Sequence, residues 1–493
     1  MQLRVRKRRP KRSGILLPLS ALPSNYGIGT LGDAAYDFID FLERTNQSYW
    51  QLLPLCPLGK GNSPYSSYSS FAGEPLYIDL DILVCQGYLK KSDIKEIDFP
   101  EKVDFDLVRS HKMPILLRAA AIFDTNRKDF KEFKRINETW LSDYALFMAI
   151  SEVSGTKDFT AWSDGLKYRL PKDLNDFKEK YAEKILFHEI LQYFFYSQFK
   201  RLKSYATAKG IKLIGDIPFY VSLESADIWS EPQYFKLGRD MTPVLVAGVP
   251  PDVFSKDGQL WGNPIYDWKT MRQNDYLWWK KRLGFNASLY DVIRIDHFRA
   301  FCDYYTIPYG SKNAKSGNWE KGEGMQFWNS VKPIISKTEI IAEDLGGESQ
   351  EVQKLISDTA FPNMKVLQFA FDSDLKDPFL PKNMNSNCVC YTGTHDNDTT
   401  LGWFNKATEK EKIIFSKLVP DVFGSVALNL IYFGMKSRAE TVIIPLQDYL
   451  ELDSNARTNT PGTEKNNWTW RAKKEDFCDD LAEKIKKCTF MRN

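Results

Sequence analysis

Four carboxyl groups each follow a short apolar run of the sequence, and acids in such places can carry out acid–base or nucleophilic chemistry. They are Asp216, Asp296, Glu343 and Asp396. The run before Asp296 is Val292-Ile293-Arg294-Ile295, which we interpret as a strand. Side chains along a strand alternate between two faces, so Arg294 and Asp296 share one face and the isoleucines the other. A buried arginine and carboxylate are costly unless they are paired or used, so we take this strand as the centre of a candidate site.

Paired carboxyl groups suit the cleavage of glycosides. One ionised group attacks the sugar carbon, a protonated group donates to the leaving oxygen, and the environment must push their pKa values apart. We expect Arg294 to keep Asp296 ionised and oriented. Glu343 follows the apolar run 340–342, and partial burial there would raise its pKa and suit it to general acid catalysis. Asp344 points the opposite way and is expected to be structural. The alternative interpretation of these acids is that they are helix N-caps and partners in loop salt bridges.

Other catalytic chemistries lack their usual motifs here. Two of the four histidines, His297 and His395, adjoin the strand-end acids, so a metal site is worth considering. However, the sequence has no HExxH and no other metal-ligand spacing, so we expect no metal. It also has no G-x-S-x-G for a Ser-His-Asp triad. No dinucleotide or phosphate-binding glycine motif lies between the first strand and the first helix, and we expect no cofactor.

Eight apolar runs have the length and flanks of strands. They cover residues 14–19, 49–55, 211–216, 292–296, 339–343, 365–370, 388–391 and 441–446. Helical periodicity lies between most of them, for example in 33–44, 182–208 and 424–437. This alternation predicts an α/β fold with parallel strands, either a (β/α)₈ TIM barrel or a doubly wound open sheet. The barrel is favoured because the four acids end their strands at the carboxyl side, where a barrel carries its active site.

The alternation of strands and helices along the sequence also predicts the domain organisation. Residues 1–12 form a basic N-terminal arm, and 13–493 form a single catalytic barrel. A main insertion covers about 56–180; it begins with a polar aromatic loop and continues with a largely helical subdomain. The aromatic-rich stretch of about 247–268 is expected to be a lid-like loop.

Charge and composition argue against a nucleic-acid or membrane protein. Seven of the 67 basic residues and none of the 64 acidic residues lie in the first twelve positions, so the remaining chain is mildly acidic. We expect the arm to be a solvated terminus, with a contact to nucleic acid or anionic lipid as the alternative. No apolar run could span a membrane, and no secretory signal is recognisable. Seven scattered cysteines without a CxxC pair are typical of free thiols in a cytoplasmic protein.

The motifs around these acids resemble the 4-α-glucanotransferases, also called amylomaltases or disproportionating enzymes, of glycoside hydrolase family 77 in the α-amylase superfamily. The resemblance spans nearly the whole chain. Its strongest parts are Arg294-Ile295-Asp296-His297-Phe298-Arg299, Ala342-Glu343-Asp344-Leu345-Gly346 and Gly393-Thr394-His395-Asp396-Asn397. It extends to residues 215–221, 247–252, 259–264, 459–463 and 467–471.

The resemblance implies a (β/α)₈ barrel with inserted subdomains and a retaining double displacement on α-1,4-glucans. Asp296 matches the nucleophile and Glu343 the acid/base. Asp396 matches a third carboxylate, which holds the 2- and 3-hydroxyls of the sugar at the cleavage point. The substrates implied are an α-1,4-glucan donor and a glucose or maltooligosaccharide acceptor, with no cofactor.

The resemblance also assigns substrate-binding residues. Arg294 and His395 match residues that position the reacting groups, and Asp216 matches a further carboxylate near the same sugar. The remaining residues, which lie in segments that line the glucan path, are Tyr65, Trp261 and Asn467. His297, beside the nucleophile but of opposite parity, is expected to contact the sugar or the nucleophile, or to brace its loop.

The carboxylates alone leave three functions open. A glucan transferase and an α-amylase-like hydrolase share the same first half-reaction, and differ in whether a sugar or water receives the glucosyl group. A non-catalytic glucan-binding protein would keep the aromatic residues without needing the carboxylates. The resemblance favours the transferase.

Overall fold

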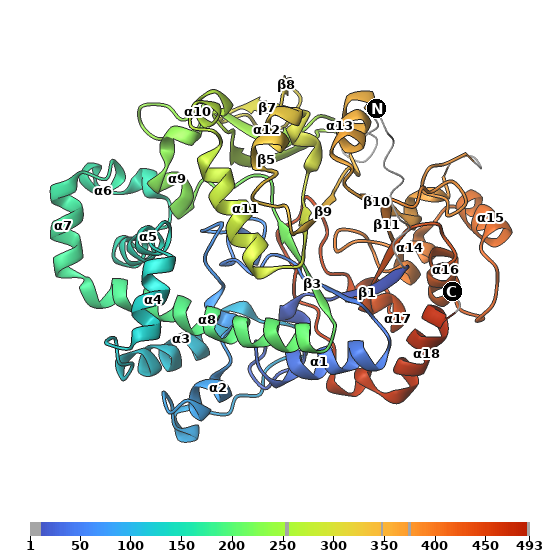
Figure 1. Cartoon of the computed structure of the whole chain (residues 1–493), viewed down its shortest axis with the longest axis horizontal. Helices are drawn as coiled ribbons and strands as arrows, with labels where there is room; N and C mark the ends of the chain where they lie inside the picture. The colour runs from blue at the N-terminus through green and yellow to red at the C-terminus, as the bar shows by residue number, and fades with distance from the viewer. Residues whose placement is uncertain (1–10, 252–255, 347–348, 373–375, 491–493) are drawn as a thin grey trace.

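Eight parallel strands close into a barrel in the computed structural model, which describes residues 11–251, 256–346, 349–372 and 376–490 (Figure 1). Neighbouring strands follow the order β1-β12-β11-β10-β9-β6-β3-β2. Their bounds are β1 Arg12–Leu16, β2 Tyr49–Gln51, β3 Lys212–Ile217, β6 Val292–Ile295, β9 Glu339–Ala342, β10 Asn363–Val366, β11 Cys388–Tyr391 and β12 Thr441–Pro445. The predicted (β/α)₈ barrel is confirmed, and the open sheet is wrong.

Three of the predicted strands end three or more residues earlier than expected. The second, predicted for 49–55, ends at Gln51. The first begins at Arg12 and ends at Leu16, and residues Leu19–Ala21 form a 3₁₀ turn instead of continuing it. The sixth ends at Val366, and Leu367–Ala370 turn into a second 3₁₀ segment. The errors in the first and sixth strands have one cause, because a short apolar run does not distinguish a buried strand from a buried helical turn.

The barrel interior is filled by side chains from all eight of its strands. These are Leu16, Tyr49, Ile214, Val292, Ile341, Met364, Val366, Val389, Tyr391 and Ile443. Ile293 and Ile295 point the other way and pack in the larger core beneath the surrounding helices. The alternation along β6 therefore directs Arg294 into the barrel, as its parity in the sequence predicts.

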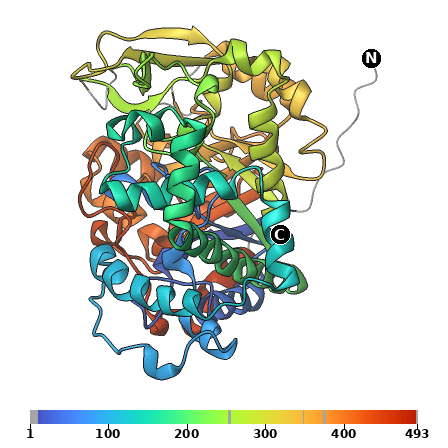
Figure 2. The same ribbon diagram turned by 90° about the vertical axis from the view of Figure 1, so that its left-hand side faces the viewer.

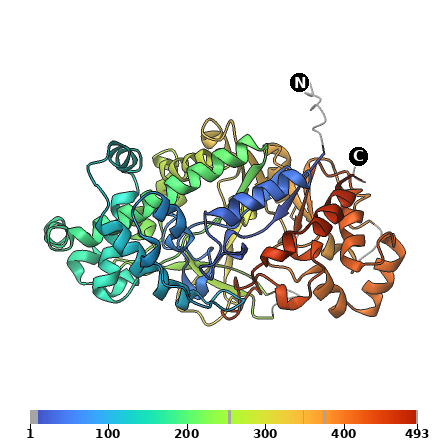
Figure 3. The same cartoon turned by 90° about the horizontal axis from the view of Figure 1, so that it is seen from below.

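Helices surround the barrel, and one neighbouring pair shows how they pack against each other. The helices outside the stretch between β2 and β3 are α1 Asp33–Arg44, α9 Ala226–Ser230, α10 Trp268–Gln273, α11 Leu277–Leu289, α12 Gly324–Val331, α13 Gln350–Thr359, α14 Thr400–Lys406, α15 Glu409–Leu418, α16 Val426–Met435, α17 Leu446–Tyr449 and α18 Asp479–Phe490. Helix α1 lies beside α8, Ala182–Ala208 (Figure 3), and the Tyr36 and Tyr205 rings join them with centroids 5.0 Å apart. In the described part of the chain no helix is long and apolar enough to cross a membrane.

The stretch between β2 and β3 is largely helical and forms a lobe beside the barrel (Figures 1 and 2). It holds α2 Leu80–Cys85, α3 Phe105–Ala121, α4 Lys128–Ile136, α5 Leu141–Ser154, α6 Asp164–Lys167 and α7 Pro171–Lys180 before α8. The predicted helical pattern is confirmed for this stretch. Gly210, just after α8, has φ +74°, the left-handed geometry in which glycine ends helices.

A second sheet stands above the barrel, at the top of Figure 2. Its four antiparallel strands have the order β5-β4-β7-β8 and are β4 Leu245–Val249, β5 Gln259–Pro264, β7 Asp303–Pro308 and β8 Asn318–Lys321. The predicted loop at 247–268 is thus wrong as to secondary structure, since it contains β5 and most of β4. Glycine and proline in β5 are typical of a loop and hide the strand from sequence reasoning. A lid function for this segment stays a prediction, and residues 252–255 lie outside the described ranges.

Candidate active site

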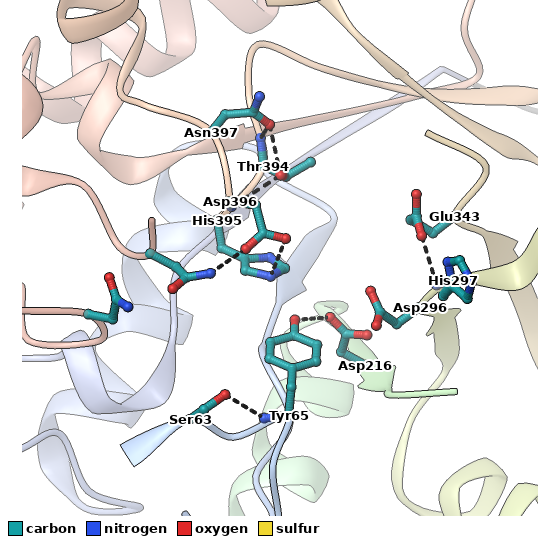
Figure 4. Close-up of polar contacts among 12 residues, drawn as sticks. Ser63, Tyr65, Asp216, Asp296, His297, Glu343, Thr394, His395, Asp396 and Asn397 are labelled. Carbon is teal, nitrogen blue, oxygen red and sulfur yellow. Dashed lines mark hydrogen bonds and ion pairs between the residues drawn. The ribbon is translucent and has the colours of Figure 1, made fainter. Parts of the chain in front are cut away.

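The four carboxyl groups predicted from the sequence surround one space at the carboxyl ends of the barrel strands (Figure 4). Asp216 belongs to β3, Asp296 follows β6, and Glu343 follows β9. Asp396 lies in the turn after β11. Strand ends are the part of a barrel where side chains from different strands converge, and this geometry brings together acids that are up to 180 positions apart in the sequence.

Arg294 ties two of these acids together. Its Nη1 donates to both carboxylate oxygens of Asp216, at 2.8 and 2.7 Å, and its Nη2 donates to Asp296 Oδ1 at 3.0 Å. Asp216 and Arg294 are direct neighbours in the register of β3 and β6. The arginine and Asp216 are almost wholly buried, whereas the Asp296 side chain is 29% exposed. Arg294 therefore fixes Asp296 at the open side of a buried ion pair.

Opposing influences set the pKa of Asp296. Burial is the largest influence and raises its pKa, the charge of Arg294 lowers it, and the other three carboxylates raise it further. The net result is a pKa raised to about 7. Arg294 thus lowers the pKa of Asp296, the direction predicted from the sequence, but burial and three neighbouring negative charges outweigh one arginine that is shared with Asp216. That Asp296 is ionised in the reacting state stays a prediction.

Glu343 is held by the backbone that directly follows Asp296. Its Oε2 accepts the N–H of His297 at 2.7 Å, and its Oε1 accepts the N–H of Leu345 at 2.7 Å. The N–H of Phe298 also donates to the Glu343 carbonyl at 3.0 Å. Burial raises the pKa of Glu343 against the opposing effects of Arg294 and these two amides, as the sequence predicts.

The left-handed turn at His297 makes this arrangement possible. His297 has φ 49° and ψ 45°, which is uncommon for a residue with a side chain and is typical of functional sites. The turn directs its N–H at Glu343 one residue after Asp296. The peptide unit between Asp296 and His297 thereby links the Asp296 and Glu343 carboxyl groups.

Asp396 has the opposite electrostatic environment. Burial opposes its ionisation, but this is outweighed by His395 and by Asn459, and the pKa of Asp396 falls well below its usual range. His395 Nε2 lies 3.2 Å from Asp396 Oδ2, and Asn459 Nδ2 donates to Oδ1 at 2.5 Å. The charge of Asp396 in turn raises the pKa of the buried His395 imidazole against its burial. Asp396 is therefore a permanent anion in this site.

Tyr65 brings the inserted loop after β2 into the site. Its hydroxyl donates to Asp216 Oδ2 at 2.7 Å (Figure 4). Its ring stacks on the His395 imidazole, with centroids 5.1 Å apart and planes 12° from parallel, and the Trp468 ring lies 5.9 Å away. Tyr65, Asp216 and His395 therefore form one connected group.

The rings of His297 and Trp261 contact each other. Their ring centroids are 4.9 Å apart with planes at 88°. Burial, and next the charge of Arg299, lower the pKa of His297 to about 4, so the ring is neutral near pH 7. Trp261 belongs to β5 of the second sheet and is 38% exposed. These rings could carry a sugar, and their contact with substrate stays a prediction.

The side chain of Asn467 makes hydrogen bonds within its own loop. Its Nδ2 donates to the carbonyl and the hydroxyl of Thr463 at 2.8 and 3.2 Å, and its Oδ1 accepts the N–H of Thr460 at 2.9 Å. The side chain thus braces the loop that carries Asn459. A direct contact with substrate stays a prediction for this residue.

Sequence reasoning missed the groups that hold Asp396. Asn459 and Arg457 contact it across more than sixty positions, Arg457 through the Asp396 carbonyl at 2.6 Å. No local pattern marks such contacts, although Asn459 lies in a segment that carries the family resemblance. Asp344 is structural as predicted, since it accepts from Asn363 Nδ2 at 2.9 Å. Among the described residues, no cluster of His, Cys, Asp and Glu is arranged as a metal site.

Comparison with known proteins gives consistent matches over the whole length. The family model described as 4-alpha-glucanotransferase, glycoside hydrolase 77, matches residues 17–476. The 4-alpha-glucanotransferase of Clostridium butyricum is 43% identical over 480 residues, covering 96% of this chain and 98% of the relative. That of Thermus thermophilus is 41% identical, covering 94% and 95%. The solved structure of the amylomaltase from Streptococcus agalactiae in complex with acarbose has a TM-score of 0.95 and 37% identity, covering 98% of this chain and 99% of that one.

Proposed function

Because the chain belongs to the 4-alpha-glucanotransferase family and is an enzyme that transfers glucan segments, we propose that it works by a retaining double displacement on α-1,4-glucans, with Asp296 as nucleophile. The observation that carries this proposal is the pair formed by Asp296 and Glu343. One peptide unit joins the two groups, both have raised pKa values, and Arg294 orients the first.

The first half-reaction forms a glycosyl-enzyme ester. Asp296, ionised, attacks the anomeric carbon, while Glu343, protonated, transfers its proton to the departing glycosidic oxygen. The bond from the anomeric carbon to that oxygen breaks, and the shortened glucan leaves with a free 4-hydroxyl. In the second half-reaction the Glu343 carboxylate takes the proton of an acceptor 4-hydroxyl. The new alkoxide oxygen bonds to the anomeric carbon, and Asp296 leaves as a carboxylate.

Asp396 and its neighbours hold the sugar during both steps. The lowered pKa of Asp396 keeps an acceptor for two sugar hydroxyls in place, and charge-assisted hydrogen bonds of this kind are the stronger ones. Asp216 and Arg294 keep the nucleophile oriented, and the ring of Tyr65, stacked on His395, closes the same side of the site. The carboxylate set argues for catalysis over glucan binding alone.

The acceptor decides between transfer and hydrolysis. Trp261 packs against the ring of His297, the residue after Asp296, and offers a partly exposed aromatic surface where an incoming sugar can replace water. A site that excludes water and holds a second sugar favours transfer. The donor is a maltodextrin-like α-1,4-glucan, and the acceptor is the 4-hydroxyl of glucose or of a maltooligosaccharide.

Incubation with maltotriose tests the proposed function. Transfer should give glucose together with a ladder of longer maltooligosaccharides, while the total number of reducing ends stays constant. An α-amylase-like hydrolase would give only shorter products, with reducing ends rising in step with substrate loss. Products no longer than maltotriose, separated by chromatography at several times, would contradict the proposal.

The pH dependence of the transfer follows from the raised pKa of Asp296. Asp296 must be ionised to attack, so activity is lost as the pH falls through its pKa, and Glu343 must carry a proton, so activity is lost as its raised pKa is passed. We expect a bell-shaped dependence of kcat/KM whose acid limb lies towards pH 7, well above the ordinary aspartate value of about 3.9. The measured limbs belong to the coupled pair. An acid limb near pH 4 would show that burial and the three neighbouring carboxylates do not raise the pKa of Asp296.

A further inference from the structure

A buried carboxylate outside the reacting groups closes the turn that carries His395 and Asp396. Asp448 lies in α17, directly after β12, and its residue is 1% exposed. Its Oδ2 accepts the hydroxyls of Thr392 and Thr400, at 2.5 and 2.8 Å. Its Oδ1 accepts the backbone N–H of Thr400 at 2.7 Å. One carboxylate thus satisfies three donors in a place where water does not reach.

The two threonines stand at the two ends of the turn. Thr392 is the first residue after β11, and Thr400 is the first residue of α14. Within the turn, Asn397 Oδ1 accepts from the N–H and the hydroxyl of Thr394, at 2.9 and 2.8 Å (Figure 4). The turn is therefore closed internally by Asn397 and fastened to the barrel at both ends by Asp448.

The neighbouring residue Gln447 holds the opposite side of Asp396. Its Nε2 donates to the Thr458 hydroxyl at 2.9 Å and to the Ala456 carbonyl at 3.3 Å. These contacts flank Arg457, whose Nη2 donates to the Asp396 carbonyl. They also stand next to Asn459, whose Nδ2 donates to the Asp396 carboxylate. Two successive residues of α17 therefore support both segments between which Asp396 is held.

We propose that Asp448, together with Gln447, is a positioning residue for the proposed reaction: it sets the place of Asp396 and His395 without touching substrate. The inference rests on the proposed function, in which Asp396 holds the sugar. A buried carboxylate with three matched donors is costly to leave unsatisfied and has one favourable arrangement. Asp448 therefore fixes the turn, which lies about fifty residues earlier in the sequence, relative to β12.

Replacement of single hydroxyls tests this role with little risk to folding. Thr392→Val removes one donor to Asp448 and keeps the side-chain shape, and Thr392→Ser restores the donor. Thr45→Val is the matched control, because Thr45 is also fully buried and donates to Phe41 O at 2.8 Å, but lies at the end of α1. Asp448→Asn tests the carboxylate itself, and Asp396→Asn serves as the reference for a lost sugar contact.

The expected result is a selective loss. Thr392→Val and Asp448→Asn should lower kcat for maltotriose transfer by about ten- to a hundredfold, the scale of a misplaced reacting geometry. Thr392→Ser should stay near wild type, and Thr45→Val within about twofold of it. The thermal midpoint of Thr392→Val should fall no further than that of Thr45→Val.

A second readout does not depend on activity. The chain has four histidines, so the His395 titration can be followed in isotope-labelled protein and assigned from the signal that is lost in His395→Gln. The pKa of His395 should be raised above the ordinary histidine value in the wild type, because Asp396 faces it. In Thr392→Val and Asp448→Asn it should move down as the pair separates, while Arg294 and Asp216 stay in place.

The outcomes distinguish a failure of the positioning role of Asp448 from a failure of the proposed role of Asp396. If Thr392→Val and Asp448→Asn match Thr45→Val in activity, or lose activity with the His395 titration unchanged, Asp448 only stabilises the fold and the inference is wrong. If Asp396→Asn keeps wild-type transfer, the proposed role of Asp396 fails instead. The inference stands when the activity loss and the titration shift occur together and Asp396→Asn is inactive.

Discussion

Asp296→Asn should lower transfer from maltotriose by at least about 10⁴-fold, the scale on which removal of a nucleophile acts. The amide keeps the shape of the carboxylate and can still accept from Arg294 Nη2, which donates to Oδ1 at 3.0 Å in the wild type. It cannot attack the anomeric carbon. Glucan binding, measured by calorimetry with maltotriose, should stay within about tenfold of wild type, because the other contacts remain. Retained turnover would remove Asp296 as the nucleophile.

The same substitution should change stability in a direction set by the pKa of Asp296. A carboxyl whose pKa is raised in the folded state stabilises the fold below its ordinary pKa, and this contribution is lost as the pH rises through about 7. Asn carries no such penalty, so Asp296→Asn should melt above wild type at pH 8 and near wild type at pH 4. Functional residues often lower stability in this way.

Asp396→Asn should change the stability in the opposite direction and is the matched comparison. The pKa of Asp396 is lowered, so its ionised form stabilises the fold above the ordinary aspartate pKa. Its replacement should therefore lower the melting temperature at pH 8, where Asp296→Asn raises it. Equal shifts in the two variants would contradict the electrostatic description of the site.

The strand from Val292 to Ile295 shows which parts of the site follow from sequence. Period-two alternation alone places Arg294 inward, and strand-end position alone places Asp296 at the active face. Eight such runs predict the barrel. The partner of Arg294 follows only from the register of β3 on β6, which joins Asp216 to it across 78 positions. Local pattern thus predicts where a side chain points, and the closed barrel decides what it meets.

The remaining features depend on geometry that sequence patterns do not carry. The left-handed backbone of His297 gives Glu343 a donor, yet histidine shows no preference strong enough to predict it. The net pKa of Asp296 depends on the depth of the site and on three other acids, which no single motif contains. The second sheet escapes prediction because β8, Asn318–Lys321, is short and polar and lacks the apolar alternation that marks a strand.

Glu343→Gln should separate the two chemical steps. With maltotriose, transfer should fall by about 10² to 10⁴-fold, because the leaving sugar is a poor leaving group without a proton. With α-maltosyl fluoride the leaving fluoride needs no proton, so Asp296 should still attack. The introduced amide cannot activate the acceptor hydroxyl, so the second step stays slow and the ester on Asp296 should accumulate. The measurement is intact-protein mass spectrometry after rapid acid quench, followed by peptide mapping to Asp296.

The arrangement at His297 makes this experiment diagnostic. In Glu343→Gln the amide oxygen can still accept the His297 N–H that holds Glu343 Oε2 at 2.7 Å in the wild type, so the link to the nucleophile is kept, while the contact of Oε1 with the Leu345 N–H is lost. Glu343 is protonated when Asp296 attacks, so the neutral amide of Glu343→Gln leaves the charges around the ionised Asp296 unchanged. If no adduct forms with the fluoride, or if the adduct maps to another residue, the proposed covalent mechanism is wrong. An adduct on Asp296 that reacts faster with sugar acceptors than with water would establish Asp296 as the nucleophile and transfer as the preferred reaction.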